Sequence, residues 1–186
     1  MKKIFIDEGA NTGISIKLFL EKYPNSNEFE IHSFEANPGL HSKLDAYSTQ
    51  ATIYHKAVYI EDTTLDFYLG TSLGSSLRKD KTTGGININN KIQVETINLA
   101  QFIKNNFSKE DYIVLKLDVE GAEYDILPHF ITEGMFDGWI NELFGEWHGG
   151  KLKEVSTNQQ QDLDKLLSGK GFYMKNWCAE RGVIEL

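Results

Sequence analysis

The feature that most constrains the fold is a glycine-containing turn near the start of the chain. The apolar run Ile4–Ile6 leads into Asp7, and Gly9 and Gly13 follow before a stretch with apolar residues at helical spacing. This order predicts a strand, a tight turn and a helix, an arrangement that binds ligands at the carboxyl end of a strand in open α/β sheets. Glycine lets the backbone approach a ligand closely, and the free N–H groups of the helix start face it. We therefore expect a cofactor at this turn.

Strand-like and helix-like segments alternate along the chain, which predicts an open, mostly parallel sheet. The most apolar strand, 112–117, is typical of a parallel sheet that is covered on both faces. Segments 172–177 and 183–186 are expected to form an antiparallel pair at the end. The predicted fold class is α/β, with a mostly parallel twisted sheet, helices on both faces and an antiparallel C-terminal strand. Further strands are predicted at 4–6, 30–35, 52–60, 64–69, 92–97 and 141–147, and helices at 16–23, 37–44, 99–107, 122–130 and 159–167.

Composition fits one acidic globular domain that spans residues 1–186. The net charge of −8 argues against nucleic acid as the main partner. No segment approaches the ~20 apolar residues of a membrane span, and the single cysteine, Cys178, allows no intrachain disulfide. We therefore expect a cytoplasmic protein without a membrane or nucleic-acid partner, and we leave a homo-oligomer open. Segment 70–90, rich in Gly, Ser, Thr and Asn, is expected to be a long flexible loop.

Carboxylates follow three of the predicted strands, at Asp7, Glu35 and Asp118. Because the carboxyl ends of parallel strands share one edge of a sheet, these side chains are expected to line one crevice. Glu35 lies 22 residues after Gly13, where dinucleotide-binding folds place the acid that accepts from ribose hydroxyls. The turn lacks the three-glycine pattern of pyrophosphate binders, and the Asp7–Glu8 pair would repel a pyrophosphate. These observations favour the sulfonium cofactor S-adenosylmethionine over NAD.

Three segments, in order, resemble the FkbM-type methyltransferase family. They are Asp-Glu-Gly-Ala-Asn-Thr-Gly at 7–13, Phe-Glu-Ala-Asn-Pro at 34–38 and Leu-Lys-Leu-Asp-Val-Glu-Gly-Ala-Glu at 115–123, and the resemblance covers about residues 3–148. It implies a Rossmann-like class I methyltransferase fold. It also implies S-adenosylmethionine-dependent O-methylation of a small hydroxylated metabolite or sugar.

The resemblance also implies roles for individual residues. Glu35 would hold the ribose with Asn37 beside it, Ala57 would border the adenine, and the Ser75–Ser76 element would lie near the cofactor. The residues expected to cradle the methionine part of the cofactor are Asp7, Gly9, Asn11 and Gly13. At the mouth of the site, Asp118 is the first candidate for the general base, with Glu120 and His148 as alternatives; His148 follows the strand end at Glu146–Trp147 and could reach the same crevice.

Other features leave alternatives open. Glu8 and Ala36 depart from the family pattern, which has an apolar residue and a proline there. Glu8 is expected either to be exposed at the strand end or to disturb the pocket. The chain starts at its first strand without an N-terminal cap, so the acceptor site is expected to be open, covered by 70–90 or completed by another chain.

Two other functions and a metal site are also compatible with parts of the sequence. The alternatives to a methyltransferase are a non-catalytic cofactor-binding module and, less favoured, an NAD-dependent oxidoreductase. Asp118, Glu146 and His148 could hold a divalent metal. Nothing in the sequence fixes their spacing, so no metal is expected.

Overall fold

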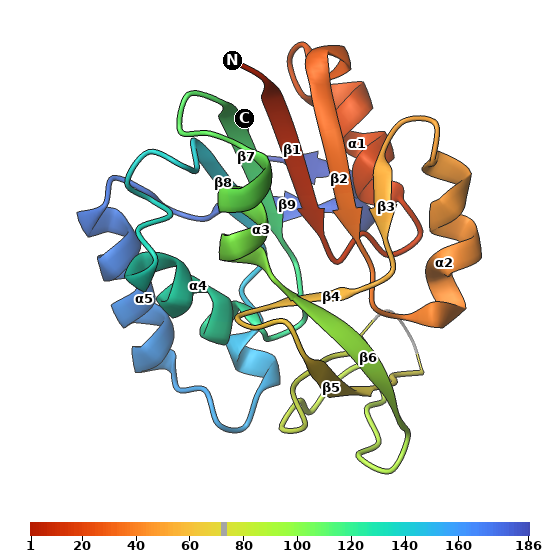
Figure 1. The fold of residues 1–186 in the computed structure, drawn as a ribbon. Helices are drawn as coiled ribbons and strands as arrows, with labels where there is room; N and C mark the ends of the chain where they lie inside the picture. The colour runs from red at the N-terminus through yellow and green to blue at the C-terminus, as the bar shows by residue number, and fades with distance from the viewer. Residues whose placement is uncertain (72–73) are drawn as a thin grey trace.

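A parallel sheet forms the centre of the molecule. The structure is a computed structural model that describes residues 1–71 and 74–186. Over these ranges, seven strands pair in the order β10-β9-β8-β7-β1-β2-β3, and only β10 runs antiparallel to its neighbour (Figure 1). The strands are β1 (Lys3–Glu8), β2 (Phe29–Phe34), β3 (Thr52–Tyr54), β7 (Tyr112–Leu117), β8 (Glu142–Gly145), β9 (Lys175–Cys178) and β10 (Val183–Ile184). The predicted fold class is therefore confirmed.

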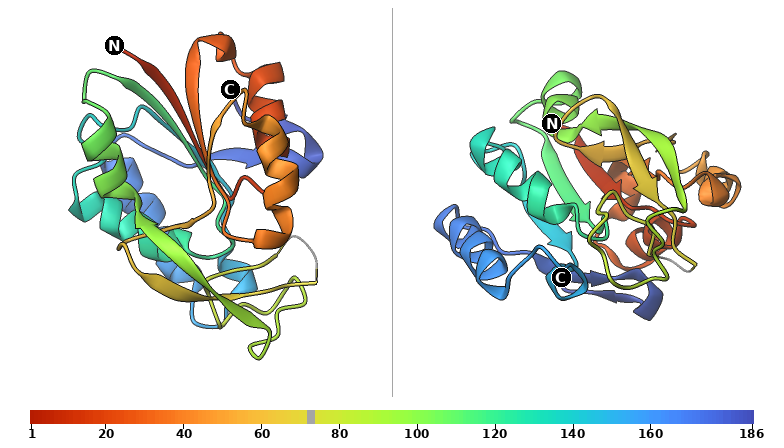
Figure 2. Two further views of the ribbon diagram at one scale, coloured as in Figure 1. Left: turned by 45° about the vertical axis from the view of Figure 1, so that its right-hand side comes forward. Right: turned by 90° about the horizontal axis from the view of Figure 1, so that it is seen from below.

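Helices cover both faces of this sheet (Figure 2). On one face, α1 and α2 pack over aromatic side chains that include Phe5, Phe19 and Trp177, whose rings stack. On the other face, α3, α4 and α5 pack over the aliphatic side chains of β1 and β7. The α-helices are α1 (Ile14–Lys22), α2 (Pro38–Leu44), α3 (Leu99–Asn106), α4 (Glu123–Thr132) and α5 (Thr157–Gly169). Short 3₁₀ helices occur at Ser26–Glu28, Asp45–Tyr47, Gly149–Lys151 and Ala179–Arg181.

A second, smaller sheet lies beyond the carboxyl ends of β1 and β2 (Figure 1). It consists of β4 (Ala57–Tyr59), β6 (Lys91–Asn98) and β5 (Thr64–Tyr68), in that spatial order. The prediction of a single strand at 52–60 is wrong, because one strand ends at Tyr54 and another begins at Ala57. Its first half pairs with β2 and its second half pairs with β6, in different sheets. The strand predicted at 141–147 is also shorter, at Glu142–Gly145.

Segment 74–90 contacts both the small sheet and the residues that follow β7 and β8. Ser76 forms a bridge with Tyr68, and Lys81 forms one with Leu152. Asp80 and Lys81 are buried. The predicted loop 70–90 also contains Ser72 and Leu73, which lie outside the described residues. These contacts fix two points of the segment, and its flexibility stays a prediction.

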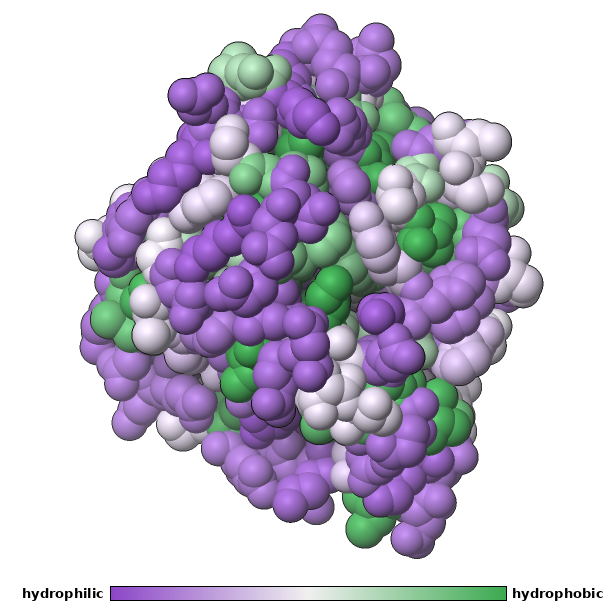
Figure 3. Space-filling model, in the orientation of Figure 1, coloured by the Kyte–Doolittle hydropathy of each residue, from purple (hydrophilic) through white to green (hydrophobic). Residues whose placement is uncertain are grey.

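The surface in Figure 3 is mainly hydrophilic, with apolar side chains in small separate areas. None of the helices in the described ranges combines the length and apolar character needed to cross a membrane.

Candidate active site

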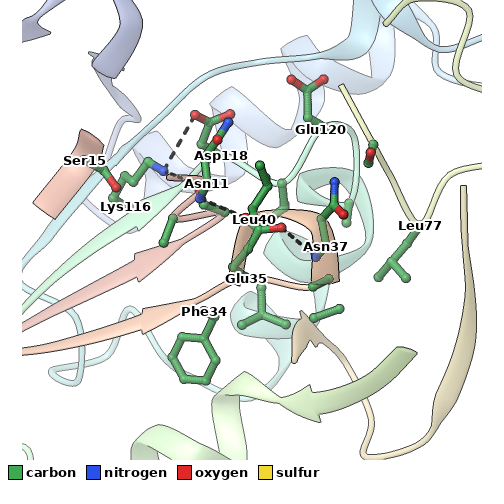
Figure 4. A pocket seen from close by; sticks show the side chains of 18 of the residues that line it. Asn11, Ser15, Phe34, Glu35, Asn37, Leu40, Leu77, Lys116, Asp118 and Glu120 are labelled. Carbon is green, nitrogen blue, oxygen red and sulfur yellow. Dashed lines mark hydrogen bonds and ion pairs between the residues drawn. The ribbon is translucent and has the colours of Figure 1, made fainter. Parts of the chain in front are cut away.

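A cavity opens at the carboxyl ends of β1, β2 and β7, where the small sheet closes one side. At one end it is lined by the turn after β1, by Glu35 and Asn37, and by the small sheet. We call this the Glu35 end. At its other end it is lined by Asp118 and Glu120, which follow β7. Figure 4 shows Glu35 between Asn11 and Asn37, with the carboxylates of Asp118 and Glu120 farther along the same cavity.

The turn after β1 is held against its two neighbouring strands. The N–H groups of Gly9 and Ala10 both donate to the carbonyl oxygen of Phe34, over 3.1 and 2.9 Å. Gly9 has φ +73°, and a Cβ there would lie 1.9 Å from the carbonyl oxygen of Asp118. Only glycine fits this position, because a side chain would collide with the backbone of Asp118, just after β7.

Glu35 is fixed by backbone donors on either side of it. Its carboxylate accepts from the N–H of Asn11 over 2.8 Å and from the N–H of Asn37 over 2.7 Å. Burial raises the pKa of Glu35, and these two hydrogen bonds oppose that rise. Each carboxylate oxygen has two lone pairs, so acceptor capacity remains for a ligand that enters the cavity. The arrangement suits a ligand with hydroxyl donors.

A buried polar cluster lies directly behind the turn. In the sheet register, Asp7 stands beside Ser33 of β2 and Lys116 of β7, so these side chains share one face. Asp7 Oδ1 lies 3.1 Å from Lys116 Nζ, and Asp7 Oδ2 accepts from Ser15 and Ser33. Lys116 Nζ also donates to the carbonyl oxygen of Gly9 over 2.9 Å. Burial alone would lower the pKa of Lys116, but the charges of Asp7 and Asp118 outweigh it and raise that pKa.

Three further titratable side chains meet at the opposite end, and we call them the acidic cluster: Asp118, Glu120 and His148. His148 Nε2 lies 3.6 Å from Asp118 Oδ1 and 3.8 Å from Glu120 Oε1. The other ring nitrogen, Nδ1, contacts the buried Glu123. Burial raises the pKa of Asp118 to about 6, against the opposing charges of Lys116 and His148. Glu120 has a positive φ of 54°, a conformation that a non-glycine residue adopts at a cost.

Family comparison agrees with this geometry. The family model of the methyltransferase FkbM domain matches residues 7–174. The chain belongs to the FkbM methyltransferase family. The matched range contains β2, β3, β7, β8 and the last two residues of β1, the residues named at both ends of the cavity, and the whole small sheet, whereas β9 and β10 lie beyond it. The fold is therefore the Rossmann-like fold of a methyltransferase. Neither the curated proteins nor the solved structures contain a significant match to the chain.

In this FkbM methyltransferase, most of the sequence-predicted site residues lie at the cavity. Those that line it are Gly9, Asn11, Glu35, Asn37, Ala57, Asp118 and Glu120. Four others, which were predicted to touch a ligand directly, lie behind its wall: Asp7, Gly13, Ser76 and His148.

Each of these four has a visible packing role. Asp7 is fully buried against Lys116. A Cβ on Gly13 would lie 2.4 Å from the ring of Tyr47. Ser76 Oγ donates to the carbonyl oxygen of Glu120, while its neighbour Ser75 lines the cavity. His148 is 1% exposed and stands behind Asp118 and Glu120. These four residues support the wall of the cavity in the FkbM methyltransferase without lining it.

The charge argument from the sequence also changes. Asp7 is paired with Lys116, and Glu8 is fully buried on the opposite face of β1, so neither carboxylate faces the cavity. Both expectations for Glu8, exposure or disturbance of the pocket, are therefore wrong. The charged groups that do line the cavity are Glu35, Asp118, Glu120 and Glu180, against Lys56 and Lys116. Four carboxylates and two ammonium groups leave an acidic excess of two, which suits a cationic ligand.

Sequence reasoning missed three residues of this site. Lys116 lies inside a motif that was recognised, and the alternation of β7 would have placed it beside Asp7. Glu123 reads in the sequence as a helix-start acid, and Lys81 as part of a solvated basic run. In the structure Lys81 is 5% exposed, and its Nζ lies 2.8 Å from Glu120 Oε2. No sequence signal connects Lys81 with Glu120, because the contact spans two separate segments of the chain.

Proposed function

We propose that this FkbM methyltransferase transfers the methyl group of S-adenosylmethionine to a hydroxyl oxygen of a small metabolite, such as a sugar. The observation that carries the proposal is that the two ends of one cavity hold different polar groups. A fixed carboxylate suited to hydroxyl donors lies at the Glu35 end, and a set of proton acceptors lies at the acidic cluster.

The residues present fit the cofactor. Glu35 would accept from the ribose hydroxyls, and the apolar wall formed by Leu40, Ala57 and Phe67 would border the adenine. The backbone at Gly9 and Asn11 would border the amino-acid tail. The excess of two carboxylates over lysines in the lining matches the positive charge of a sulfonium. When bound, the cofactor supplies an already activated methyl group, so the protein mainly has to align the acceptor and manage its proton.

The acidic cluster would manage that proton. Asp118 is the first candidate, because its carboxylate lines the cavity and its pKa of about 6 leaves it ionised at neutral pH. General-base assistance of this kind contributes typically ~10²–10⁴-fold to a rate. Alignment of the acceptor hydroxyl with the methyl group can contribute roughly 7–11 kcal/mol more.

Titration calorimetry with S-adenosylhomocysteine, and separately with NAD, tests the cofactor. We expect saturable heat with the former and none with the latter, and the reverse result would exclude the proposal.

Transfer from methyl-labelled S-adenosylmethionine to a panel of sugars and other hydroxylated metabolites then tests the reaction. Labelled product from a hydroxyl acceptor is the expected result. Binding of S-adenosylhomocysteine without transfer to any acceptor would instead indicate a non-catalytic binding module.

A further inference from the structure

The acidic cluster brings two carboxylates and one buried imidazole nitrogen together without a hydrogen bond between them. Asp118 Oδ1 and Glu120 Oε1 both face His148 Nε2, at 3.6 and 3.8 Å. These separations are longer than hydrogen bonds. His148 Nε2 is buried and has no hydrogen-bond partner among residues 1–71 and 74–186. Such a buried, unsatisfied nitrogen is costly unless something binds it.

The second ring nitrogen determines the state of the first. His148 Nδ1 contacts Glu123 Oε1, and both side chains are at most 1% exposed. A carboxylate only accepts hydrogen bonds, so Nδ1 carries the proton and donates it. A cation that binds here would replace any proton on Nε2, so that this nitrogen presents its lone pair to the space between the two carboxylates. A histidine oriented in this way by a carboxylate is the usual arrangement of a metal-binding imidazole.

The carboxylates are also oriented from outside. Lys81 Nζ lies 2.8 Å from Glu120 Oε2, and Lys116 Nζ lies 3.7 Å from Asp118 Oδ2. Each lysine therefore faces one oxygen of its partner and leaves the other directed to His148. Asp118, Glu120 and His148 each have one possible metal-ligand atom, and these three atoms lie within 4.8 Å of one another.

We propose that Asp118 Oδ1, Glu120 Oε1 and His148 Nε2 bind a divalent cation. Metal–ligand bonds of about 2.1 Å can join two donor atoms that are up to about 4.2 Å apart, so one ion reaches both carboxylates from Nε2. Two hard oxygens and one imidazole suit Mn²⁺ or a similar first-row ion better than a soft metal. This departs from the sequence-based expectation of no metal. Glu120 joins the residues that the sequence offered for one, and Glu146 Oε2 also lies near, 3.9 Å from His148 Nε2.

The consequence for the reaction rests on the proposed function. A cation at this position lies at the cavity wall formed by Asp118 and Glu120, where it would bind the acceptor hydroxyl and make it easier to deprotonate. The acceptor would then be a molecule whose hydroxyl oxygen, alone or together with a neighbouring oxygen, binds the cation.

Mn²⁺ itself is the probe. The chain of residues 1–186 is treated with EDTA, desalted and titrated with Mn²⁺, while the paramagnetic resonance signal of free Mn²⁺ is recorded. We expect one saturable site per chain. Asp118→Asn and Glu120→Gln should each weaken binding at least ~10-fold, and Glu123→Gln should weaken it about 10- to 100-fold through the imidazole.

Two control variants test whether Mn²⁺ binds at the acidic cluster and not at other side chains. Cys178→Ser alters the neighbouring group of Glu146, Cys178 and Glu180, which could also hold an ion. Asp66→Asn removes a carboxylate on β5 that lies outside the cavity lining. Both should bind Mn²⁺ like the unaltered chain. Glu120 lies at the cavity surface, so Glu120→Gln remains a usable variant if a buried substitution does not fold.

Several results would overturn the inference. They are the absence of saturable Mn²⁺ binding, unchanged binding in Asp118→Asn and Glu120→Gln, or loss of binding in Cys178→Ser. Calorimetry with S-adenosylhomocysteine on the same samples separates the two proposals. Cofactor binding without Mn²⁺ binding would remove only the metal site, whereas Mn²⁺ binding without cofactor binding would remove the proposed function.

Discussion

The two ends of the cavity differ in how their polar groups are satisfied. At the Glu35 end, the carboxylate accepts two backbone hydrogen bonds, and behind it Asp7 is paired with Lys116 and two serines. At the acidic cluster, His148 Nε2 lies 3.6 Å from Asp118 Oδ1 and 3.8 Å from Glu120 Oε1, too far for hydrogen bonds. Satisfied groups hold a ligand in a fixed position, whereas unsatisfied ones are available for a proton or an ion. We therefore propose that the first end binds the cofactor and that the second end carries out the chemistry.

Replacement of Asp118 with Asn should show the difference between the two ends of the cavity most clearly. We expect kcat to fall by about 10²–10⁴-fold, because either a general base or a cation ligand is lost. The dissociation constant for S-adenosylhomocysteine should change little, since Glu35 is untouched. Steady-state kinetics with an identified acceptor, together with calorimetry, measure both quantities. Asp66→Asn, outside the cavity, is the matched control, and equal losses of binding and turnover in Asp118→Asn would contradict the assignment.

Replacement of Glu35 with Ala should produce the opposite pattern. The dissociation constant for S-adenosylhomocysteine should rise about 10- to 100-fold, because a charged acceptor contributes roughly 1.5–3 kcal/mol per hydrogen bond. At saturating cofactor, kcat should stay close to that of the unaltered chain. Glu30→Ala, an exposed acid on the same strand, serves as the control in calorimetry. Unchanged affinity in Glu35→Ala would show that the ribose does not bind at this end.

The Glu35 end could be predicted from the sequence because its parts are local. Gly9 and Asn11 belong to one turn, and Glu35 and Asn37 belong to one strand-to-helix junction. The parallel topology then follows from the alternation of strands and helices, which places both junctions at one sheet edge. The two halves of 52–60 were not separable in the same way, because β-branched and aromatic residues fill both and no periodicity marks the break.

The acidic cluster was only partly predictable, since its supports come from distant segments. Lys81 and Glu120 are 39 positions apart, and His148 and Glu123 are 25 apart. Both pairs depend on how segment 74–90 and the residues after β8 fold over the sheet. A sequence motif records neighbours along the chain, so it identified Asp118 and Glu120, and the strand end at Glu146–Trp147 indicated His148. Neither signal indicated Lys81 or Glu123, which contact them.

Glu8 allows a test of how much an unpaired buried carboxylic acid that does not face the cavity destabilises the folded protein. It is fully buried beside Phe34 and Leu117 in the sheet register, and neither carboxylate oxygen has a partner in the described part of the chain. Burial raises its pKa well above the usual value, although Lys116 opposes the rise. Glu8→Gln keeps the shape and the polar burial but removes the ionisation.

The effect of Glu8→Gln should therefore depend on pH. Above the unfolded pKa of about 4.3, the unfolded chain loses the Glu8 proton while the folded chain keeps it, so the native protein is progressively destabilised as pH rises toward the folded pKa. Each pKa unit of difference corresponds to about 1.4 kcal/mol. Urea unfolding at pH 5 and pH 8 should show a free-energy gain for Glu8→Gln that is larger at pH 8. An equal difference at both pH values would mean that Glu8 is ionised in the folded protein, and that an unpaired carboxylate can persist in this sheet without a function.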